Sequence, residues 1–382
     1  MECPRLDELL PAGVPPGARI YLMPRDPCPR AGLDALFAGG RALPLAGGLL
    51  AFSVCDVVVR TPGRIQRAAA AVPEIMEWAD RCGGMAQERI HMLLANLGRR
   101  RPDPSREPMP APRLMGILNV TPDSFSDGGE NLDPAAAIAR GIEMVEAGAD
   151  ILDVGGESTR PGAEPVAPET EMARVLPVLQ GLATARSAFP KLQISIDTRH
   201  ASVMAAALAT GIDIVNDVTA LAGDPASLAV VSNSMATVVL MHMRGDPQTM
   251  NQAPTYEDAA LDVFDELEGR IRACIEVGIA HQRIIVDPGI GFAKRGRHNL
   301  AILRSLTLYH ALGCPILLGL SRKGLGGEAE ARLTPKERLP TSLAAALHAL
   351  NQGVQVLRVH DVAETRRVAD LWQRLNGPDD DH

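Results

Sequence analysis

The chain has 382 residues, and its 46 aspartate and glutamate residues outnumber its 38 lysine and arginine residues, for a net charge of −8. This balance argues against a general nucleic-acid binder or acidic-membrane binder, and no uninterrupted apolar run approaches the roughly 18 residues that span a bilayer. The six cysteines are scattered without a CxxC pair. They predict reduced thiols in a cytoplasmic protein rather than a disulfide framework or a zinc site, and the acidic N-terminus predicts no signal peptide.

Residues 1–100 predict an N-terminal extension or a small α/β domain, with strands at 21–24 and 48–59 and helices at 64–80 and 85–98. The next segment, 101–113, is rich in proline and arginine and predicts an exposed linker. Few contacts are expected to cross such a linker, so we expect the N-terminal region to fold independently. Its residues do not indicate what it does.

Residues 114–376 alternate short apolar runs with helical stretches rich in alanine, leucine and glutamate. The predicted strands are 114–118, 150–154, 193–197, 213–216, 236–241, 283–287, 315–319 and 355–359. The predicted helices are 134–147, 169–187, 200–210, 225–233, 257–277, 298–312, 335–352 and 361–375. Eight strand–helix units predict an α/β fold, a (β/α)8 TIM barrel with an additional small N-terminal α/β region. A doubly wound open sheet is the alternative, but the glycine-rich dinucleotide turn that it favours does not follow the first strand.

The first predicted barrel strand ends in a polar, glycine-terminated loop, NVTPDSFSDGG. Asn119 and Asp127 supply hard oxygen ligands that suit Mg2+. Ser124 and Ser126 suit an anion, and Phe125 stands alone among polar residues as a side chain able to stack on a ring. This loop therefore predicts chemistry at the carboxyl end of the strand.

Polar residues also follow the other seven predicted strands, and they form two groups. Asp197, Asn216, Asp287 and Lys323 can line a narrow slot for a planar heterocycle rich in nitrogen. Asn119, Arg160, Arg358 and His360 can bind an anion together with magnesium. A heterocycle beside a polyanion indicates transfer from a pyrophosphate ester. No Ser–His–Asp or Cys–His spacing favours covalent catalysis.

Several motifs in this order resemble those of the dihydropteroate synthase family of folate biosynthesis. They are NVTPDSFSDGG, DVGGESTRPG, ISIDT, IVND, LMHMRG, DPGIGF, SRKG and RVHD. The resemblance covers about 114–375, and the first two motifs are long and specific. It implies a pterin-binding TIM barrel that condenses 6-hydroxymethyl-7,8-dihydropterin diphosphate with 4-aminobenzoate, releases pyrophosphate and is inhibited by sulfonamides.

The resemblance also assigns roles to single residues. It places the pterin slot on Asp197, Asn216, Met241, Asp287 and Lys323, and the anion site on Asn119, Arg358 and His360. Asn119 and Asp127 would lie near Mg2+, and Asn119, Asp127, Arg160, Lys323, Arg358 and His360 would be the catalytic set. The aminobenzoate pocket would contain Phe125, Thr159, Arg160, Pro161, Phe292 and Ser321. The reaction would be dissociative and assisted by magnesium, and the family implies a homodimer through the late barrel helices.

Two features depart from the family pattern, because Gly324 stands where serine is common and 325–327 replaces an FIG-like segment. Both concern the aminobenzoate side and therefore sulfonamide affinity. A pterin-dependent methyltransferase and a catalytically silent paralogue are the alternatives. The first does not need the diphosphate loop or SRK, and the second would be expected to lose loop residues that this chain retains.

Overall fold

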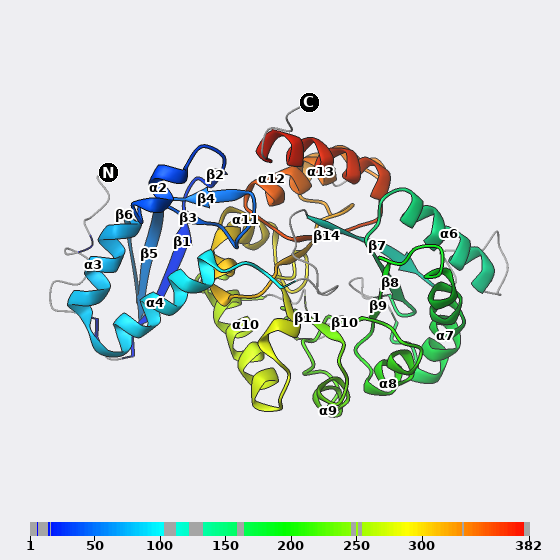
Figure 1. The fold of residues 1–382 in the computed structure, drawn as a ribbon. Helices are drawn as coiled ribbons and strands as arrows, with labels where there is room; N and C mark the ends of the chain where they lie inside the picture. Colours follow the sequence, from blue (N-terminus) through cyan, green and yellow to red (C-terminus); the bar gives the residue numbers. More distant parts are fainter. Residues whose placement is uncertain are drawn as a thin grey trace.

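The computed structural model describes residues 6, 14–15, 17–102, 112–121, 133–158, 164–245, 250, 254–330 and 332–377. A barrel with helices around it forms the larger part, and two small antiparallel sheets with three helices lie against one side of it (Figure 1). Within this part of the chain, no helix has the length and apolarity needed to cross a membrane.

The barrel sheet is parallel, and its strands follow the chain order. They are β7 (Arg113–Asn119), β8 (Ile151–Gly155), β9 (Gln193–Asp197), β10 (Ile214–Asp217), β11 (Thr237–Met241), β12 (Ile284–Asp287), β13 (Leu317–Gly319) and β14 (Val356–Val359). The pairing order is β12-β11-β10-β9-β8-β7-β14-β13. A parallel bridge between Val286 and Ile316 joins the two edge strands and closes the ring. The predicted (β/α)8 barrel is confirmed, and the open sheet is excluded.

Each strand is followed by helical structure on the outside of the barrel. The α-helices are α6 (Pro134–Glu146), α7 (Pro168–Ala185), α8 (Ala201–Ala209), α9 (Ser227–Ser232), α10 (Ala259–Glu276), α11 (Gly296–Arg304), α12 (Leu339–Asn351) and α13 (Val362–Asn376). Short 3-10 helices accompany them: η1 (His281–Arg283), η2 (Leu306–Leu312) and η3 (Gly327–Glu330). The predicted helix 298–312 is therefore two elements, because the chain turns more tightly after Ser305 and buries every residue of η2.

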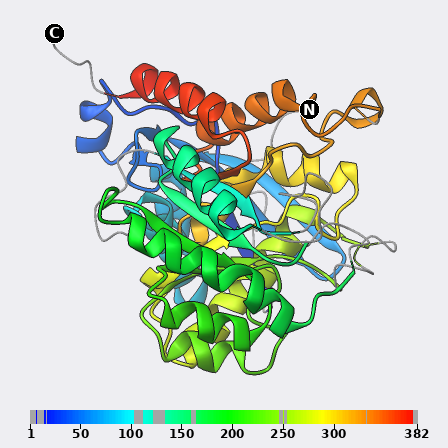
Figure 2. The ribbon, with the colours of Figure 1, turned by 90° about the vertical axis from the view of Figure 1, so that its right-hand side faces the viewer.

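The N-terminal region contains two three-stranded sheets. Its elements are β1 (Arg19–Pro24), β2 (Cys28–Pro29), α2 (Asp34–Ala38), β3 (Leu43–Pro44), β4 (Leu50–Phe52), β5 (Val54–Thr61), β6 (Arg64–Ala71), α3 (Val72–Cys82) and α4 (Gly84–Gly98). One sheet has the order β1-β5-β6 and the other β2-β4-β3. In Figure 2 the helices α6, α7 and α8 lie in front and this blue region lies behind the barrel.

The predicted helix at 64–80 is wrong over its first half, where the chain forms β6. The alanines of RIQRAAAA favour a helix, but this preference amounts to tenths of a kcal/mol per residue. Pairing along the whole of the valine-rich β5, from Val54↔Ala71 to Thr61↔Arg64, outweighs it. The turn residues Pro62 and Gly63 between the two strands were the local signal for a hairpin, and Gly63 has a φ of 72°.

The expectation that few contacts join the N-terminal region to the barrel is also wrong. The rings of Tyr21 in β1 and Phe264 in α10 meet edge to face with centroids 5.5 Å apart. The hydroxyl of Thr307 in η2 donates to the carbonyl of Pro24 at 2.7 Å. Arg101 is 2% exposed and donates to the carbonyl of His310 at 2.6 Å, so the predicted exposed linker is buried at this residue. The two parts share one hydrophobic core.

Candidate active site

The site is built on the two-residue period of the barrel strands. A layer of apolar side chains fills the barrel interior: Met115, Ile151, Ile214, Val239, Ile285, Leu317 and Val356. Residues two positions further along a strand point to the same side. At the carboxyl ends these residues include Asp153, Asn216, Met241, Asp287 and Arg358. The regular strand pairing therefore places a polar ring directly above an apolar floor.

Arg358 joins two acidic side chains of this ring. Its Nε donates to Asp153 Oδ2 at 2.6 Å, and its Nη2 donates to Asp197 Oδ2 at 2.6 Å. Asn216 Nδ2 donates to the same Asp153 oxygen at 2.9 Å. The second oxygens, Asp153 Oδ1 and Asp197 Oδ1, are buried and accept no hydrogen bond from the described residues. These two free acceptors suit the N–H donors of a bound heterocycle.

Burial raises the pKa of Asp197 to about 7, although the Arg358 guanidinium opposes the shift. Asp287 lies at the end of β12, and burial also raises its pKa, against the opposing charge of Lys323. Desolvation lowers the pKa of Lys323 to about 8, and Asp287 acts in the opposite direction. A ligand that hydrogen-bonds to these groups would therefore replace solvation that the fold has removed.

Lys323 follows β13 and lies against the loop after β12. Its Nζ donates to the carbonyl of Ile290 and stands 4.8 Å from the centroid of the Phe292 ring. Gly289 in this loop has a φ of 68°, and a Cβ there would lie 2.1 Å from the carbonyl oxygen of His242. Only glycine fits this approach, which brings the loops after β11 and β12 together.

A buried lysine that the sequence reasoning missed joins the same two loops. Lys294 Nζ donates to the carbonyls of His242 at 3.1 Å and Phe292 at 2.8 Å, and lies 2.9 Å from His242 Nδ1. Desolvation lowers the pKa of Lys294 to about 7 and that of His242 to about 4. The other ring nitrogen of His242 lies 2.9 Å from Glu266 Oε2. A neutral imidazole therefore connects Lys294 to an acidic group on α10.

The ends of β13 and β14 bring Ser321 and His360 together. Ser321 Oγ accepts from the backbone N–H of His360 at 3.1 Å and lies 3.1 Å from its Nδ1. Arg322, with a φ of 61°, donates to both carboxylate oxygens of Asp361 at 3.0 and 2.6 Å. This bidentate pair fixes the turn that carries Ser321 and Lys323 beside the segment that carries His360.

The loop after β8 is anchored by a second ionic group. Arg199 donates to both oxygens of Glu157 at 2.9 and 3.0 Å, and Glu157 also accepts from the N–H of Val166 at 3.0 Å. Glu157, Glu171 and His200 bring three ligand atoms within 4.8 Å of one another, which is close enough to hold a cation. Arg199 already neutralises the charge of Glu157. The ion pair and the Val166 hydrogen bond therefore hold the loop at Glu157 and at Val166 without a bound cation.

The structure brings together most of the residues that the sequence predicted. Asp197, Asn216, Met241, Asp287, Lys323 and Arg358 meet at the barrel mouth, with Phe292, Ser321, His360 and Asn119 on its neighbouring loops and strand ends. Phe125, Asp127, Thr159, Arg160 and Pro161 lie outside the described residues. Asp153, His242 and Lys294 were not among the predicted site residues. Asp153 could have been found, because it follows the interior residue Ile151 by two positions.

Comparison with known proteins agrees with this geometry. Residues 115–360 match the family model of the pterin binding enzymes. The dihydropteroate synthase of Neisseria meningitidis serogroup B is 46% identical over 269 residues, which are 69% of this chain and 93% of the relative. The chain is similar in structure to Xanthomonas albilineans dihydropteroate synthase with 4-aminobenzoic acid, with a TM-score of 0.66, 44% identity and coverage of 71% and 96% of the two chains.

A Yersinia pestis dihydropteroate synthase in a complex with a sulfonamide drug gives a TM-score of 0.66 at 38% identity, over 70% of this chain and 95% of that one. The family match begins after the N-terminal region, so the comparisons concern the barrel and its loops. This chain belongs to the pterin-binding enzyme family and, within it, to the dihydropteroate synthases.

Proposed function

We propose that the chain joins 6-hydroxymethyl-7,8-dihydropterin diphosphate to 4-aminobenzoate and releases pyrophosphate and 7,8-dihydropteroate. The observation that carries this proposal is the polar ring above the apolar barrel floor. Its free acceptors Asp153 Oδ1 and Asp197 Oδ1 lie beside Asn216, and the ammonium of Lys323 lies nearby to meet a ring carbonyl or nitrogen. This donor and acceptor set matches a pterin and leaves the barrel mouth for the diphosphate.

The test is a coupled pyrophosphate-release assay with both substrates and a control without 4-aminobenzoate. Release that depends on the arylamine, with dihydropteroate identified by mass spectrometry, supports the proposal. Pyrophosphate release that is independent of the arylamine, or no release, would contradict it. Asn216→Asp is the informative variant, because it replaces the donor to Asp153 by a further carboxylate and should abolish turnover.

At the end of β7, Asn119 supplies an amide oxygen of the hard type that Mg2+ prefers. This Oδ1 borders Gly155, 3.8 Å from the position that a Cβ there would take. We propose that Asn119 and Asp127 hold Mg2+, which supplies positive charge to the departing pyrophosphate. Arg358, Arg160 and His360 would bind the same anion, and Arg358 would exchange its present carboxylate partners for it.

We propose a dissociative reaction in which cationic side chains stabilise the leaving pyrophosphate and the dihydropterin stabilises the methylene cation. The arylamine of 4-aminobenzoate is neutral at pH 7, so Asp197 and Asp287 serve as binding carboxylates. Phe125, Thr159, Pro161, Phe292 and Ser321 would position the aminobenzoate ring, and sulfonamides would occupy the same pocket. Binding of 4-aminobenzoate should then require pyrophosphate, magnesium and a pterin, and calorimetric titration with and without them tests this order.

We further propose a cytoplasmic homodimer. Exposed leucines mark the last two helices: Leu347 on α12, and Leu371 and Leu375 on α13, of which Leu375 is 71% exposed. The five described cysteines are free thiols, as the cytoplasm maintains them. Sedimentation of the wild type and of Leu371→Glu tests the dimer: a shift of the variant to the monomer supports this surface, and a monomeric wild type overturns it.

A further inference from the structure

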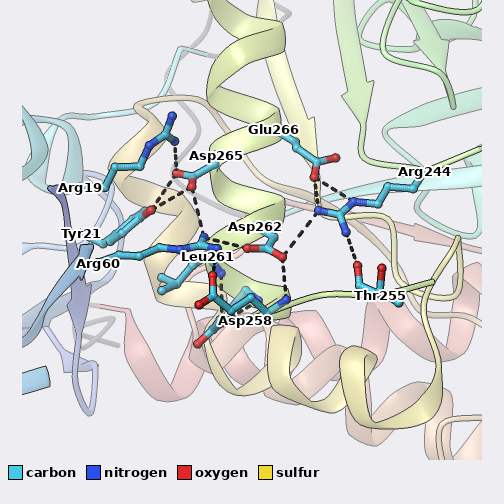
Figure 3. Close-up of polar contacts among 12 residues, drawn as sticks. Arg19, Tyr21, Arg60, Arg244, Thr255, Asp258, Leu261, Asp262, Asp265 and Glu266 are labelled. Atoms are coloured by element: carbon cyan, nitrogen blue, oxygen red, sulfur yellow. Dashed lines mark hydrogen bonds and ion pairs between the residues drawn. The ribbon is translucent and has the colours of Figure 1, made fainter. Parts of the chain in front are cut away.

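A continuous series of polar contacts begins in the N-terminal region and reaches the barrel loops (Figure 3). Arg60, near the end of β5, contacts α10 through Asp262: its Nη1 lies 2.7 Å from Asp262 Oδ1. Its Nη2 lies 2.5 Å from Glu257 Oε2. Asp262 is 8% exposed as a residue, so its carboxylate depends on partners within the fold rather than on solvent.

Arg244, which follows β11, contacts two carboxylates of α10. Its Nη2 lies 3.6 Å from Asp262 Oδ2, and its Nε donates to Glu266 Oε1 at 2.9 Å. It also donates to the carbonyl of Thr255, and its guanidinium stands 4.1 Å from the centroid of the Tyr256 ring. The charge of Asp262 therefore lies between an arginine of the N-terminal region and an arginine of the barrel loop.

The series continues from Glu266 into the site. Glu266 Oε2 lies 2.9 Å from His242 Nε2, and Lys294 Nζ lies 2.9 Å from the other ring nitrogen. Lys294 donates to the carbonyl of Phe292, and Lys323 donates to the carbonyl of Ile290 in the same loop. The last contacts thus fix the loop against which the pterin-slot lysine rests.

We propose that Arg60 is a positioning residue for the pterin side of the active site and acts through Asp262, Arg244, Glu266, His242 and Lys294. Loss of Arg60 leaves Asp262 with Arg244 as its charged partner, beside the backbone N–H of Glu257, which donates to Asp262 Oδ2 at 3.1 Å. Arg244 would then shift toward Asp262 and away from Glu266. Glu266 then holds His242 and the Lys294 loop less firmly, and Lys323 loses its fixed support. The N-terminal region would thereby contribute to turnover without touching a substrate.

A second ion pair across the same junction provides a matched control. Arg89 in α4 lies 2.5 Å from Glu268 on α10, and both side chains are 25% exposed. Among the described residues, the Glu268 carboxylate pairs with Arg89 and with no member of the series from Asp262 to Lys294. Arg60 also pairs with Asp265 at 3.4 Å, so its loss should lower the melting temperature more than the loss of Arg89 does. If cross-junction ion pairs served only to attach the N-terminal region, neither variant should change the kinetics with the pterin diphosphate.

The experiment measures steady-state kinetics and melting temperature for Arg60→Ala, Arg89→Ala, Glu266→Gln and the Arg60→Ala/Glu266→Gln double variant. We expect Arg60→Ala to lower kcat/KM for the pterin diphosphate about three- to tenfold and to leave KM for 4-aminobenzoate unchanged. Arg89→Ala should match the wild type. In the Glu266→Gln background, the additional loss of Arg60 should have no further effect on kcat/KM, because the two residues act in series.

Hydrogen exchange supplies a readout that does not need turnover. Arg60→Ala should speed exchange of the 289–294 amides, and Arg89→Ala should not. Asp262→Asn, which breaks the series at the next residue, should reproduce both effects and replaces Arg60→Ala if that variant does not fold. Additive effects of Arg60→Ala and Glu266→Gln, or equal effects of Arg60→Ala and Arg89→Ala, would overturn the proposal. Only the kinetic measurements rest on the proposed function. If the wild type were inactive, the proposed function would be contradicted, and the hydrogen-exchange comparison would still test the role of Arg60.

Discussion

At the scale of single residues, the site depends on charges that the fold has partly removed from water. Asp197 and Lys323 both show this: burial raises the pKa of the acid to about 7, and desolvation lowers that of the lysine to about 8. Such groups bind a complementary ligand strongly because their desolvation has already occurred in the folded protein. The same physics makes each of them sensitive to substitution.

Lys323→Ala should remove the pterin site without unfolding the barrel, since the side chain follows β13 on a turn and not in the core. Loss of a charged hydrogen-bonding group facing a ligand costs about 2–5 kcal/mol of binding free energy. Calorimetry of pterin diphosphate binding measures the loss, with exposed Lys336→Ala as the control. Unchanged affinity in Lys323→Ala would show that this lysine does not bind the pterin.

Glu171 predicts a specific pH dependence of stability. Its side chain is fully buried in α7 and accepts no hydrogen bond within the described residues, and burial raises its pKa from 4.5 to about 7, only partly offset by the nearby Thr198 hydroxyl. The folded protein therefore binds the proton more tightly than the unfolded chain. The resulting stability is fully present below pH 4.5 and is lost as the pH rises through about 7.

Glu171→Gln should accordingly raise the melting temperature at pH 8, where the ionised wild-type side chain costs roughly 3 kcal/mol, and change it little at pH 5. Glu169→Gln, exposed in the same first turn of α7, is the control and should show no such pH-dependent gain. Thermal denaturation at both pH values decides the matter. A fall in stability of Glu171→Gln at pH 8 would mean that the ionised carboxylate has a stabilising partner.

At the scale of elements, close approach between two loops shapes the pterin side of the site. The loop after β12 approaches the end of β11 closely at Gly289, and Lys294 joins the same two segments through hydrogen bonds to the carbonyls of His242 and Phe292. Secondary structure alone does not specify this contact, because His242 in one loop and residue 288 in the other are 46 positions apart in the chain. The contact requires glycine at position 289 for a steric reason, and substitution of Gly289 tests this directly.

Gly289→Ala should destabilise the protein by more than about 2 kcal/mol, because the new Cβ would overlap the carbonyl of His242 in a left-handed backbone conformation. Gly296→Ala is the matched control, since nothing lies within 4 Å of its Cβ position at the start of α11. Urea unfolding should show a loss for the first variant and no loss, or a slight gain, for the second. Equal stability of the two would contradict so close an approach of the loops.

At the scale of the whole molecule, the N-terminal region is packed onto the barrel rather than tethered to it. Figure 1 shows its sheets and α4 beside the barrel, and the contacts of Tyr21, Arg60, Arg89 and Thr307 cross this junction. The match to the Neisseria meningitidis relative covers 69% of this chain and 93% of that protein. The N-terminal region is therefore additional to the part of this chain that matches the relative, and part of the barrel surface is buried against it.

A truncated chain that begins near Pro108 should be less soluble and melt at a lower temperature than the full chain. Removal of residues 1–107 exposes the face of η2, including fully buried Tyr309, together with Phe264 on α10. It also leaves Asp262 and Asp265 without Arg60. Soluble yield, melting temperature and synthase rate of the two proteins test this. A truncated chain with full stability would restore the independent-domain interpretation.

The sequence by itself determined the barrel, its eight strand–helix units and most of the residues at its mouth. It could do so because the two-residue period of strands and the polar residues at strand ends are local features. Tertiary structure alone decided that RIQRAAAA pairs as β6, that Arg101 is buried, and that His242 and Lys294 join the site. Each of these depends on partners far away in the chain, whose burial and pairing energies exceed the weak local preferences that a sequence pattern records.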